Sequence, residues 1–528
     1  MSITRSVAKA AAFLMIANLL SRILGFLRES LIANYFGKSG ATDAYFAAFN
    51  LPDLIYWLLV GGVLSAAFIP VLSEYLAKGR EEEAWRVVSS VVNILFISLS
   101  VLIILGLLFT PVFVRMQVPG FNQEDMELAT GLTRIILIQP LLLALSGLTM
   151  GVLNSYKVFW PSALGSVLYN VCIILFGIIF SDPNRPESIS GFAFGVVVGA
   201  AVNFAVQIPA LKKVGLRYYP LIDWHHPGVR KITALALPII ISYTINQLQV
   251  IVSANLASSL PQGSITAIQW SYRLYLLPVG IFALAVAVAA FPTLAEQAAL
   301  KNWQRFREIN SSAVRMIIFL TVPVSVGMIV LRYPLLRVLF QHGAFTAQDT
   351  AATALPLFFF SLGIFAQAII QVLPRAFYAL QDTWTPVLVG ILSMFVNIGG
   401  MFVLLKPLAQ GGVALATSVA AFLNMFILFY LLRKRLGGID GGRILSTFVR
   451  TVVAALMMGV LIWVWSTFLN GYLGEGKLAS LVVLISGIGL GVLVFGVAAY
   501  VLRMEEFRQA VGLWQRKLGR LGRSEVKH

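Results

Sequence analysis

Two arginines and a glutamate interrupt the first long apolar run of the chain, which covers residues 11 to 36. Arg22, Arg28 and Glu29 stand in a stretch that is otherwise long and apolar enough to cross a membrane. An uncompensated arginine at mid-bilayer costs roughly 2.5 to 3.5 kcal/mol, so such residues normally face a wet cavity, a partner or a substrate. A further arginine, Arg273, recurs in a later apolar segment. These residues indicate an anionic cargo that crosses the membrane.

Apolar runs of this length repeat from one end of the chain to the other. Of 528 residues, 59% are hydrophobic and 12% are charged, and the mean hydropathy is +0.87, whereas roughly half of a soluble domain is apolar. The predicted fold is an all-α polytopic membrane protein with about 14 transmembrane helices. We place the spans at residues 9–36, 42–76, 87–114, 128–153, 158–180, 189–211, 231–257, 264–296, 311–331, 350–378, 384–405, 411–432, 446–469 and 478–502.

The formal charge of +17 follows the topology. With the N-terminus inside, 27 of the 39 Lys and Arg residues fall on the inner side, seven fall on the outer side, and five lie within or at the ends of spans. The positive-inside rule then predicts a multi-pass protein of the bacterial cytoplasmic membrane with both termini cytoplasmic. The basic excess would meet anionic lipid headgroups, and nucleic acid is not expected as a partner.

Weak self-similarity at a nearly constant offset predicts a duplication. AFIPVLSE (67–74) resembles AAFPTLAE (289–296) at an offset of 222 residues, and GFAFGVVVGAAVN (191–203) resembles GVALATSVAAFLN (412–424) at 221. NSYKVFWP (154–161) lies 225 residues before ALQDTWTP (379–386). Because six spans is an even number, both repeats enter the membrane in the same orientation, which permits one lobe to rock against the other.

The repeat divides the chain into four predicted regions. Two six-helix lobes, related by a parallel pseudo-two-fold repeat, occupy residues 1–215 and 216–436. Two additional transmembrane helices follow at 437–505, and a basic cytoplasmic tail occupies 506–528.

The first lobe holds most of the candidate cavity residues. Arg22 and Arg28 are six residues apart, which on a helix separates them by about 120°, so both can border one broad cavity. Glu29 can pair with either arginine or with Arg273. Span 2 adds Asp43 near its outer end and Asp53 after Pro52.

Pro52 is followed later in span 2 by Gly61 and Gly62. Proline and glycine in one long span favour a bend, so these three residues are candidate hinge positions. Glu74 and Glu296 occupy matching repeat positions near the inner face. They are candidate gate residues, although a structural capping role is favoured.

In the second lobe, Arg273 is surrounded by aromatic residues, among them Trp270. Guanidinium groups bind phosphate oxygens bidentately and stay charged, and aromatic rings can stack on a sugar. The two lobes are therefore expected to present polar residues to each other around a diphosphate. The alternative is that each arginine pairs internally or extends to the interface.

No pattern of catalytic chemistry accompanies these residues. The sequence contains no P-loop, GxSxG or HExxH motif and no paired carboxylates placed for catalysis. The single cysteine, Cys172, excludes a disulfide framework, and the four histidines have no third ligand nearby in sequence. We predict a protein that is not an enzyme, with no catalytic residues, no metal site and no cofactor.

Four stretches resemble, in the same order, sequences of the lipid II flippase family MurJ (also called MviN), within the multidrug/oligosaccharidyl-lipid/polysaccharide exporter superfamily. They are SRILGFLRESLIANYFG, ATDAYFAAFNLPDLI, GGVLSAAFIPVLSEY and LPRAFYALQDTWTPV, and the resemblance covers essentially the whole chain. It implies export of lipid-linked peptidoglycan precursor by alternating access without ATP hydrolysis.

By this resemblance Arg28 and Arg273 would contact the diphosphate of the undecaprenyl-linked precursor. Arg22, Glu29 and Asp43 would be supporting cavity residues, and spans 13 and 14 would form a groove for the polyprenyl tail.

This chain departs from the family pattern in several places. Glu29 stands where aspartate is usual, and Tyr56 or Trp57 stands where many members have arginine. Gly61 replaces an acidic residue, and Tyr272 and Leu276 occupy positions that are acidic in some members. We retain Tyr56 among the candidate substrate-binding residues.

Three other functions remain open at this point. A flippase for another undecaprenyl-diphosphate glycan, such as an O-antigen or capsule unit, would need much the same charges. A drug/cation antiporter would call for carboxylates rather than arginines in the cleft. A scaffold or lipid-modifying enzyme lacks a catalytic constellation. The expected partners are lipid II or a related glycolipid and anionic membrane lipids, with cell-wall synthesis proteins as further candidates.

Overall fold

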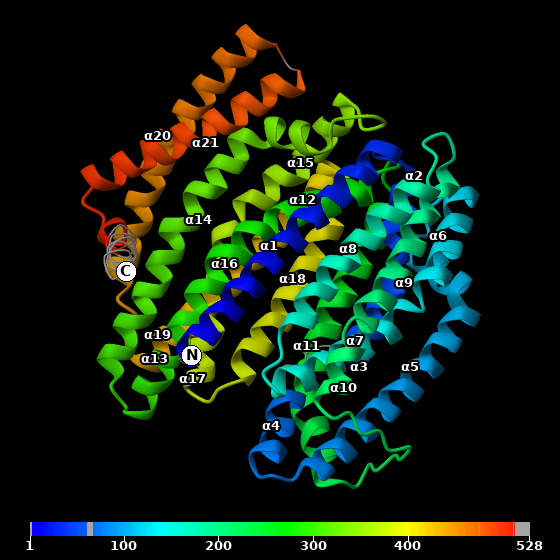
Figure 1. Ribbon diagram of the computed structural model, residues 1–528. Helices are drawn as coiled ribbons and strands as arrows, with labels where there is room; N and C mark the ends of the chain where they lie inside the picture. The colour runs from blue at the N-terminus through cyan, green and yellow to red at the C-terminus, as the bar shows by residue number, and fades with distance from the viewer. Residues whose placement is uncertain (1–2, 61–66, 475, 510–511, 513–528) are drawn as a thin grey trace, which may run out of the picture. The chain divides into compact units, whose positions relative to one another are not determined.

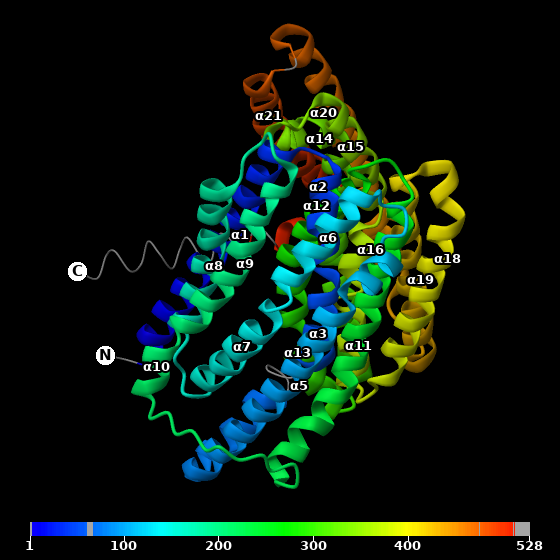
Figure 2. The ribbon, with the colours of Figure 1, turned by 90° about the vertical axis from the view of Figure 1, so that its right-hand side faces the viewer.

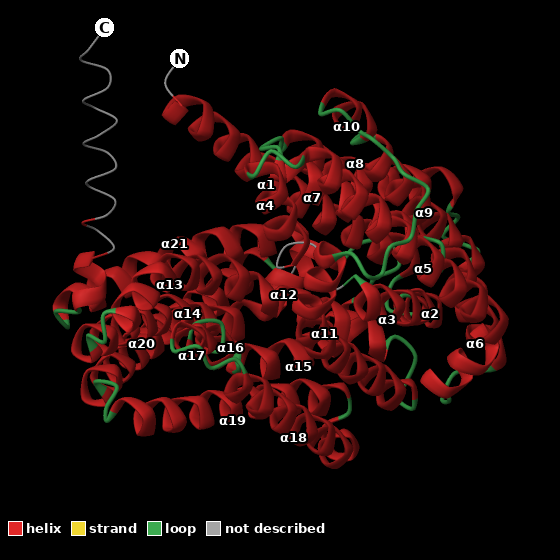
Figure 3. Ribbon diagram, turned by 90° about the horizontal axis from the view of Figure 1, so that it is seen from below, coloured by secondary structure: helices red, strands yellow, loops and turns green. Residues whose placement is uncertain are grey.

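The computed structural model describes residues 3–60, 67–474, 476–509 and 512. Helices dominate these residues, and Figure 3 shows no strand in the described part of the chain. The predicted all-α fold class is therefore confirmed. Gly61 and Gly62, two of the predicted hinge residues, lie outside the described ranges.

The chain divides into two compact units, each described here by itself. The first contains residues 1–266 and 342–346, and the second contains residues 267–341 and 347–528. The predicted lobe boundary at 215/216 follows the sequence repeat, which is a different criterion from compactness, and it stays a prediction together with the other domain limits.

The first unit consists of α1 to α11 and the start of α12, coloured from blue to green in Figure 1. Its helices are α1 (Ile3–Phe36), α2 (Gly40–Ala48), α3 (Asn50–Leu59), α4 (Ile69–Ala77), α5 (Glu81–Gln117), α6 (Gln123–Ile136), α7 (Gln139–Ser155), α8 (Trp160–Phe180), η2 (Pro186–Ile189), α9 (Ser190–Ala205), α10 (Ile208–Lys213) and α11 (Pro227–Ser258).

The second unit contains the rest of α12 and the helices that follow. They are α12 (Ser264–Pro278), the π-helical turn η3 (Val279–Ala283), α13 (Leu284–Ala299), α14 (Trp303–Phe340), α15 (Ala347–Leu362), α16 (Ile364–Ile369), α17 (Leu373–Ala379), α18 (Trp384–Leu408), α19 (Gln410–Leu436), α20 (Gly441–Leu473) and α21 (Lys477–Val501).

Length and hydropathy identify ten described helices that can cross a membrane, or eleven if the bent pair made by residues 347–362 and 364–379 is one span. These eleven coincide with eleven of the 14 predicted spans. The other three correspond to α1, to the series α2 to α4, and to α11. The count of 14 is consistent with the structure but is not reached by this criterion.

Span 2 is broken where the sequence predicts a bend. The break between α2 and α3 falls at Phe49, three residues before Pro52. Proline has no N–H to donate to the carbonyl of residue 48, and its ring crowds that carbonyl, so the helix is interrupted there. Movement about Pro52 remains a prediction.

Small residues bring neighbouring helices together inside the first unit. A Cβ added to Gly195 of α9 would lie 2.7 Å from the Cα of Ile173 on α8, and one added to Gly199 would lie 2.8 Å from the carbonyl oxygen of Tyr169. Close approach through glycine is the usual way in which helices associate in lipid. Figure 2 shows α8 and α9 side by side as a result.

Buried charge fastens the last helices to the second unit. Arg315 on α14 donates from Nη1 to Glu506 at 2.7 Å and to Glu505 at 2.9 Å, just after α21. Thr447 on α20 donates its hydroxyl to Glu506 at 3.1 Å. The Arg315 guanidinium holds the pKa of Glu505 below its usual range. One guanidinium thus ties together α14, α20 and the segment after α21.

Matching turns occur in the two units at the offset of the sequence repeat. Gly79, before α5, and Lys301, before α14, both have left-handed backbones, with φ of 69° and 54°. Lys157 and Gln381 also share this conformation, with φ of 62° and 59°, one residue after the ends of α7 and α17. These correspondences support the predicted duplication at the level of the backbone.

Candidate anion-binding site and apolar groove

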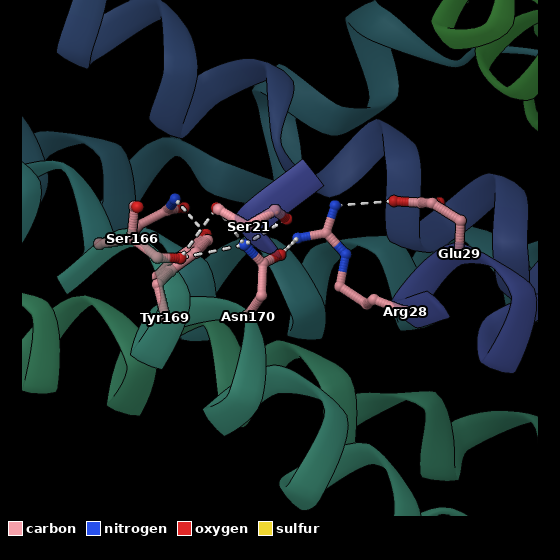
Figure 4. Close-up of polar contacts among 7 residues, drawn as sticks. Ser21, Arg28, Glu29, Ser166, Tyr169 and Asn170 are labelled. Atoms are coloured by element: carbon pink, nitrogen blue, oxygen red, sulfur yellow. Dashed lines mark hydrogen bonds and ion pairs between the residues drawn. The ribbon is translucent and has the colours of Figure 1, made fainter. Parts of the chain in front are cut away.

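Arg28 lies on α1 within a cluster of polar side chains in the first unit (Figure 4). Its Nη2 donates to Oε1 of Glu29 at 2.7 Å, and its Nη1 donates to Oδ1 of Asn170 on α8 at 3.4 Å. The two charged side chains are 18% and 4% exposed. Nε of Arg28 is buried and has no hydrogen-bond partner among the described residues. Arg28 is therefore oriented by two partners and retains a donor that an anion can use.

A polar face of α8 supports this arginine. Ser166, Tyr169 and Asn170 are spaced three and four residues apart, so they share one side of the helix. Nδ2 of Asn170 donates to the carbonyl oxygen of Ser166 at 3.1 Å and to the hydroxyl of Ser21 on α1 at 3.2 Å. With its amide nitrogen engaged in this way, Asn170 turns its amide oxygen toward Arg28, as Figure 4 shows.

Tyr169 extends the cluster toward α7 and α3. Its hydroxyl accepts a hydrogen bond from Nε2 of Gln139 on α7 at 3.1 Å, and its ring lies within electrostatic reach of Arg28 and Asp53. Sequence reasoning missed Gln139, Tyr169 and Asn170. The available signal was the polar spacing within the apolar α8, but only the fold reveals which residues it faces.

Arg22 is not part of this hydrogen-bonded cluster. It is exposed on α1 and forms no ion pair with the described residues. Its predicted role as a second cavity arginine stays untested.

Asp43 is committed to the start of α12. Its two carboxylate oxygens accept hydrogen bonds from the backbone N–H of Gly263 at 2.6 Å, the backbone N–H of Thr266 at 2.7 Å and the Thr266 hydroxyl at 2.6 Å. The side chain is buried. A carboxylate at a helix N-terminus satisfies N–H groups that have no partner within the helix. The geometry favours a structural role, and the predicted contact of Asp43 with substrate stays untested.

Asp53 and the aromatic residues that follow it occupy α3. The carboxylate of Asp53 is half-buried and has no hydrogen bond or ion pair with the described residues. One turn later, Trp57 stacks on Tyr243 of α11, with ring centres 4.5 Å apart and an angle of 11°. Tyr56 packs edge-on against Trp57 at 5.3 Å. Aromatic rings thus stand where the sequence comparison expects an arginine.

Arg273 lies on α12 in the second unit, half-buried and followed by aromatic packing. Trp270 is fully buried and stacks on Phe340, with ring centres 4.9 Å apart. Tyr275 stacks on Phe360 at 5.3 Å. In this conformation Trp270 is a packing residue, and its predicted contact with substrate remains a prediction, as does that of Arg273.

The two predicted gate glutamates have different surroundings. Glu74 accepts from Lys78 at 2.6 Å and from Lys231 of α11 at 2.7 Å, so it links α4 to α11. Glu296 on α13 is exposed and has no ion pair within the described part of the chain. Gating by either residue stays untested. Among the described residues, no group of three His, Cys, Asp or Glu side chains is placed to hold a metal ion.

An apolar groove of about 670 Å³ lies in the second unit between α14, α20 and α21. Its lining includes Pro323 and Gly327 of α14, Ile462 of α20, and Ile488 and Gly491 of α21. A Cβ on Gly491 would lie 2.9 Å from Ile462. Glycine therefore permits the close approach of α20 and α21, which run side by side in orange and red in Figure 1.

Comparison with known proteins agrees with this arrangement of fold and polar residues. The family profile described as "Lipid II flippase MurJ" matches residues 32–484. The chain is 31% identical over 452 residues to "Lipid II flippase MurJ" of Burkholderia cenocepacia, covering 84% of this chain and 87% of the relative. It is 30% identical over 502 residues to "Probable lipid II flippase MurJ" of Vibrio cholerae, covering 93% and 95%.

Solved structures give the same result for the fold. A structure titled "Lipid II flippase MurJ, inward closed conformation" matches with a TM-score of 0.77 and 27% identity, covering 94% of this chain and 99% of that one. An inward-facing multidrug resistance MATE transporter of the MOP superfamily matches with a TM-score of 0.68 and 16% identity, covering 81% and 98%. The second likeness concerns the fold alone.

Proposed function

Because this chain belongs to the MurJ family of lipid II flippases, we propose that it moves lipid II, a lipid-linked peptidoglycan precursor, from the inner to the outer leaflet of the bacterial cytoplasmic membrane. The observation that carries the proposal is Arg28, an intramembrane arginine held by Glu29 and Asn170 with a buried N–H left unused. A charge in this position is costly unless it binds an anion or a partner. Both termini lie in the cytoplasm in this proposal.

Arg28 binds the diphosphate of the precursor. A guanidinium presents five N–H donors in a plane, so it can keep one partner while it accepts a phosphate oxygen on another edge. Glu29 balances the charge of Arg28 when no substrate is bound. Arg22 and Arg273 supply further positive charge to the same anion during transport. No covalent bond in the substrate changes.

The groove between α14, α20 and α21 accommodates the polyprenyl tail. Its lining is almost entirely apolar, and a hydrocarbon chain gains roughly 0.8 kcal/mol for each methylene group that it buries. The headgroup and the tail are then bound by different parts of the chain. Alternating access moves the headgroup across, while the tail stays in an apolar environment.

The deciding experiment is replacement of the native flippase in a cell depleted of it. We expect the wild-type chain to restore growth and to make lipid II accessible from outside. Arg28→Ala should lose both activities while remaining in the membrane at normal levels. Loss of viability with the wild-type chain, despite normal membrane expression, would rule out the proposed function.

A flippase for another undecaprenyl-diphosphate glycan is the second candidate, since Arg28 recognises the diphosphate and not the sugar. The match to the lipid II flippase family profile over residues 32–484 favours the peptidoglycan precursor. Export of an O-antigen or capsule unit, with no export of lipid II, would reverse this preference. A drug/cation antiporter is disfavoured because Arg28 would repel a cationic drug.

A further inference from the structure

A second cavity, separate from the apolar groove, opens at one end of the second unit. It has a volume of about 570 Å³ and lies among the ends of α13, α14, α17 and α19. Trp303, Tyr378, Gln381 and Arg435 contribute its polar groups, and Phe291 and Ala298 are among its apolar residues. We call this cavity the helix-end pocket.

The aromatic residues of the helix-end pocket are typical of a membrane interface. Trp303 is 40% exposed, Tyr378 is 42% exposed and Phe291 is 37% exposed. Trp303 is the first residue of α14, and Tyr378 lies in the last turn of α17. Trp and Tyr side chains at helix ends are enriched at the level of lipid headgroups, where an apolar ring also meets water.

Arg435 gives the helix-end pocket a positive charge. It is the only charged residue that lines the pocket within the described part of the chain. Its Nη1 donates to Asp382, a residue that also accepts from the backbone N–H and hydroxyl of Thr385. The Arg435 side chain is 43% exposed, and its Nε and Nη2 donate to no described residue. The pocket therefore contains an anchored cation with unused N–H donors.

The chain around the helix-end pocket is also basic. Lys301 lies two residues before Trp303, and Arg433 and Lys434 directly precede Arg435; all three are exposed. Glu296 and Asp382 are the acidic residues next to lining positions, and Asp382 is already paired with Arg435. The charge balance at this end of the unit favours an anionic ligand.

The first unit fills the corner that corresponds to the helix-end pocket. There Trp85 of α5 is 1% exposed and stacks on Tyr156, the residue that ends α7. The matched turns of the two units place Arg307 at the position of Trp85 and Leu380 at that of Tyr156. Nε of Arg307 donates to the carbonyl oxygen of Trp303 at 3.2 Å. The second unit has thus lost both rings that close this corner in the first.

We propose that the helix-end pocket binds the phosphate headgroup of an anionic phospholipid from the leaflet at the basic face of the protein. Arg435 donates to the phosphate through Nε and Nη2, while Trp303 and Tyr378 border the glycerol region and Phe291 contacts the start of an acyl chain. A zwitterionic lipid carries the same phosphate but also a cation, which Arg435, Lys434 and Lys301 repel. The ligand is an annular lipid and not the transported precursor, so this proposal is independent of the proposed function.

The test uses the full-length protein in detergent, titrated with phosphatidylglycerol or with phosphatidylcholine of identical acyl chains. Native mass spectrometry measures the bound lipid. We expect the wild type to retain phosphatidylglycerol at least tenfold more strongly than phosphatidylcholine. The double variant Asp382→Asn, Arg435→Gln removes the ion pair without orphaning the carboxylate, and it should lose this preference.

Two further variants keep the test decisive if the double variant folds poorly. Ala298→Trp fills the pocket without changing any charge, and it should also abolish retention. Arg433→Gln removes a neighbouring exposed charge that does not line the pocket, and it should retain the lipid like the wild type. Equal retention of both lipids, unchanged retention in Ala298→Trp, or displacement by inorganic phosphate at concentrations that leave bulk lipid unaffected would each overturn the proposal. The last outcome would point to a soluble phosphorylated ligand.

Discussion

At the scale of single residues, the site depends on how an intramembrane arginine is held. Glu29 follows Arg28 directly, so their pairing is visible in the sequence. Asn170 is 142 residues away from Arg28 and contributes the second acceptor only because α8 packs against α1. An amide here orients the guanidinium without neutralising it, so that Arg28 remains available to an anion.

We expect Asn170→Ala to lower lipid II transport about tenfold without removing the protein from the membrane. The variant deletes the acceptor for Nη1 and the donor to Ser21, so Arg28 becomes free to turn away from its productive orientation; one lost hydrogen bond to a charged group is worth about 1.5 to 3 kcal/mol. Flipping in proteoliposomes measures the effect. Asn184→Ala, at an exposed turn asparagine, is the control, and equal activity of the two variants would exclude a role for Asn170.

At the scale of elements, two helix starts depend on a carboxylate. Asp43 binds the N–H groups at the start of α12, and Asp382 binds Thr385 in the first turn of α18. Each contact joins segments whose relation is set by a tight turn, so backbone conformation and charge act together.

The turn before α12 requires glycine at position 263. Its φ is 82°, and a Cβ there would lie 2.3 Å from Cγ and 2.6 Å from the carbonyl oxygen of Lys38. Gly263→Ala should therefore destabilise the protein by about 1 to 3 kcal/mol, seen as a lower Tm. Gly215 has a φ of 83° but open space around it, so Gly215→Ala isolates the backbone cost. Equal loss of Tm in the two variants would mean that the contact with Lys38 is unimportant.

Asp382 should make stability depend on pH. Partial burial acts to raise the pKa of its carboxyl group, but hydrogen bonds from Thr385 and Arg435 outweigh this and hold it below the usual value. The stabilisation is therefore present above pH about 4, the ordinary pKa of aspartate, and is lost as the pH falls through the lower pKa of the folded state.

Comparison with Asp382→Asn checks this pH dependence. The wild type should have the higher Tm near neutral pH, by an amount equivalent to about 1 kcal/mol or less because the Arg435 side chain is 43% exposed. The two melting temperatures should converge in acid. A difference that stays constant from pH 7 to pH 3 would contradict a contribution from the carboxylate charge.

At the scale of the whole molecule, transport requires a polar site for the headgroup and an apolar site for the tail in the same chain. The structure provides Arg28 and its partners in the first unit, and the groove between α14, α20 and α21 in the second. Neither feature alone suits an amphiphile with a charged head and a long hydrocarbon chain.

Filling the groove should therefore impair long substrates selectively. Gly327 lines the groove and has no atom within 4 Å of a Cβ placed on it, so Gly327→Leu adds volume to the groove without a clash. We expect flipping of the undecaprenyl substrate to fall severalfold while a short-chain analogue is unaffected. Gly489→Leu is the matched control, since Gly489 is equally open but does not line the groove. Equal loss for both chain lengths would argue against a tail-binding role.

The sequence by itself determined the all-helical membrane class, the intramembrane arginines and the family, because hydropathy, charge and motif order are local properties of the chain. It also located the interruption near Pro52, since the missing N–H of proline acts within one turn. Only the tertiary structure decided that Asn170 holds Arg28, that Asp43 is engaged by the start of α12, and that Trp270 is buried on Phe340. Each of these depends on contacts between residues far apart in sequence, and helix packing selects them among many polar and aromatic residues of similar spacing.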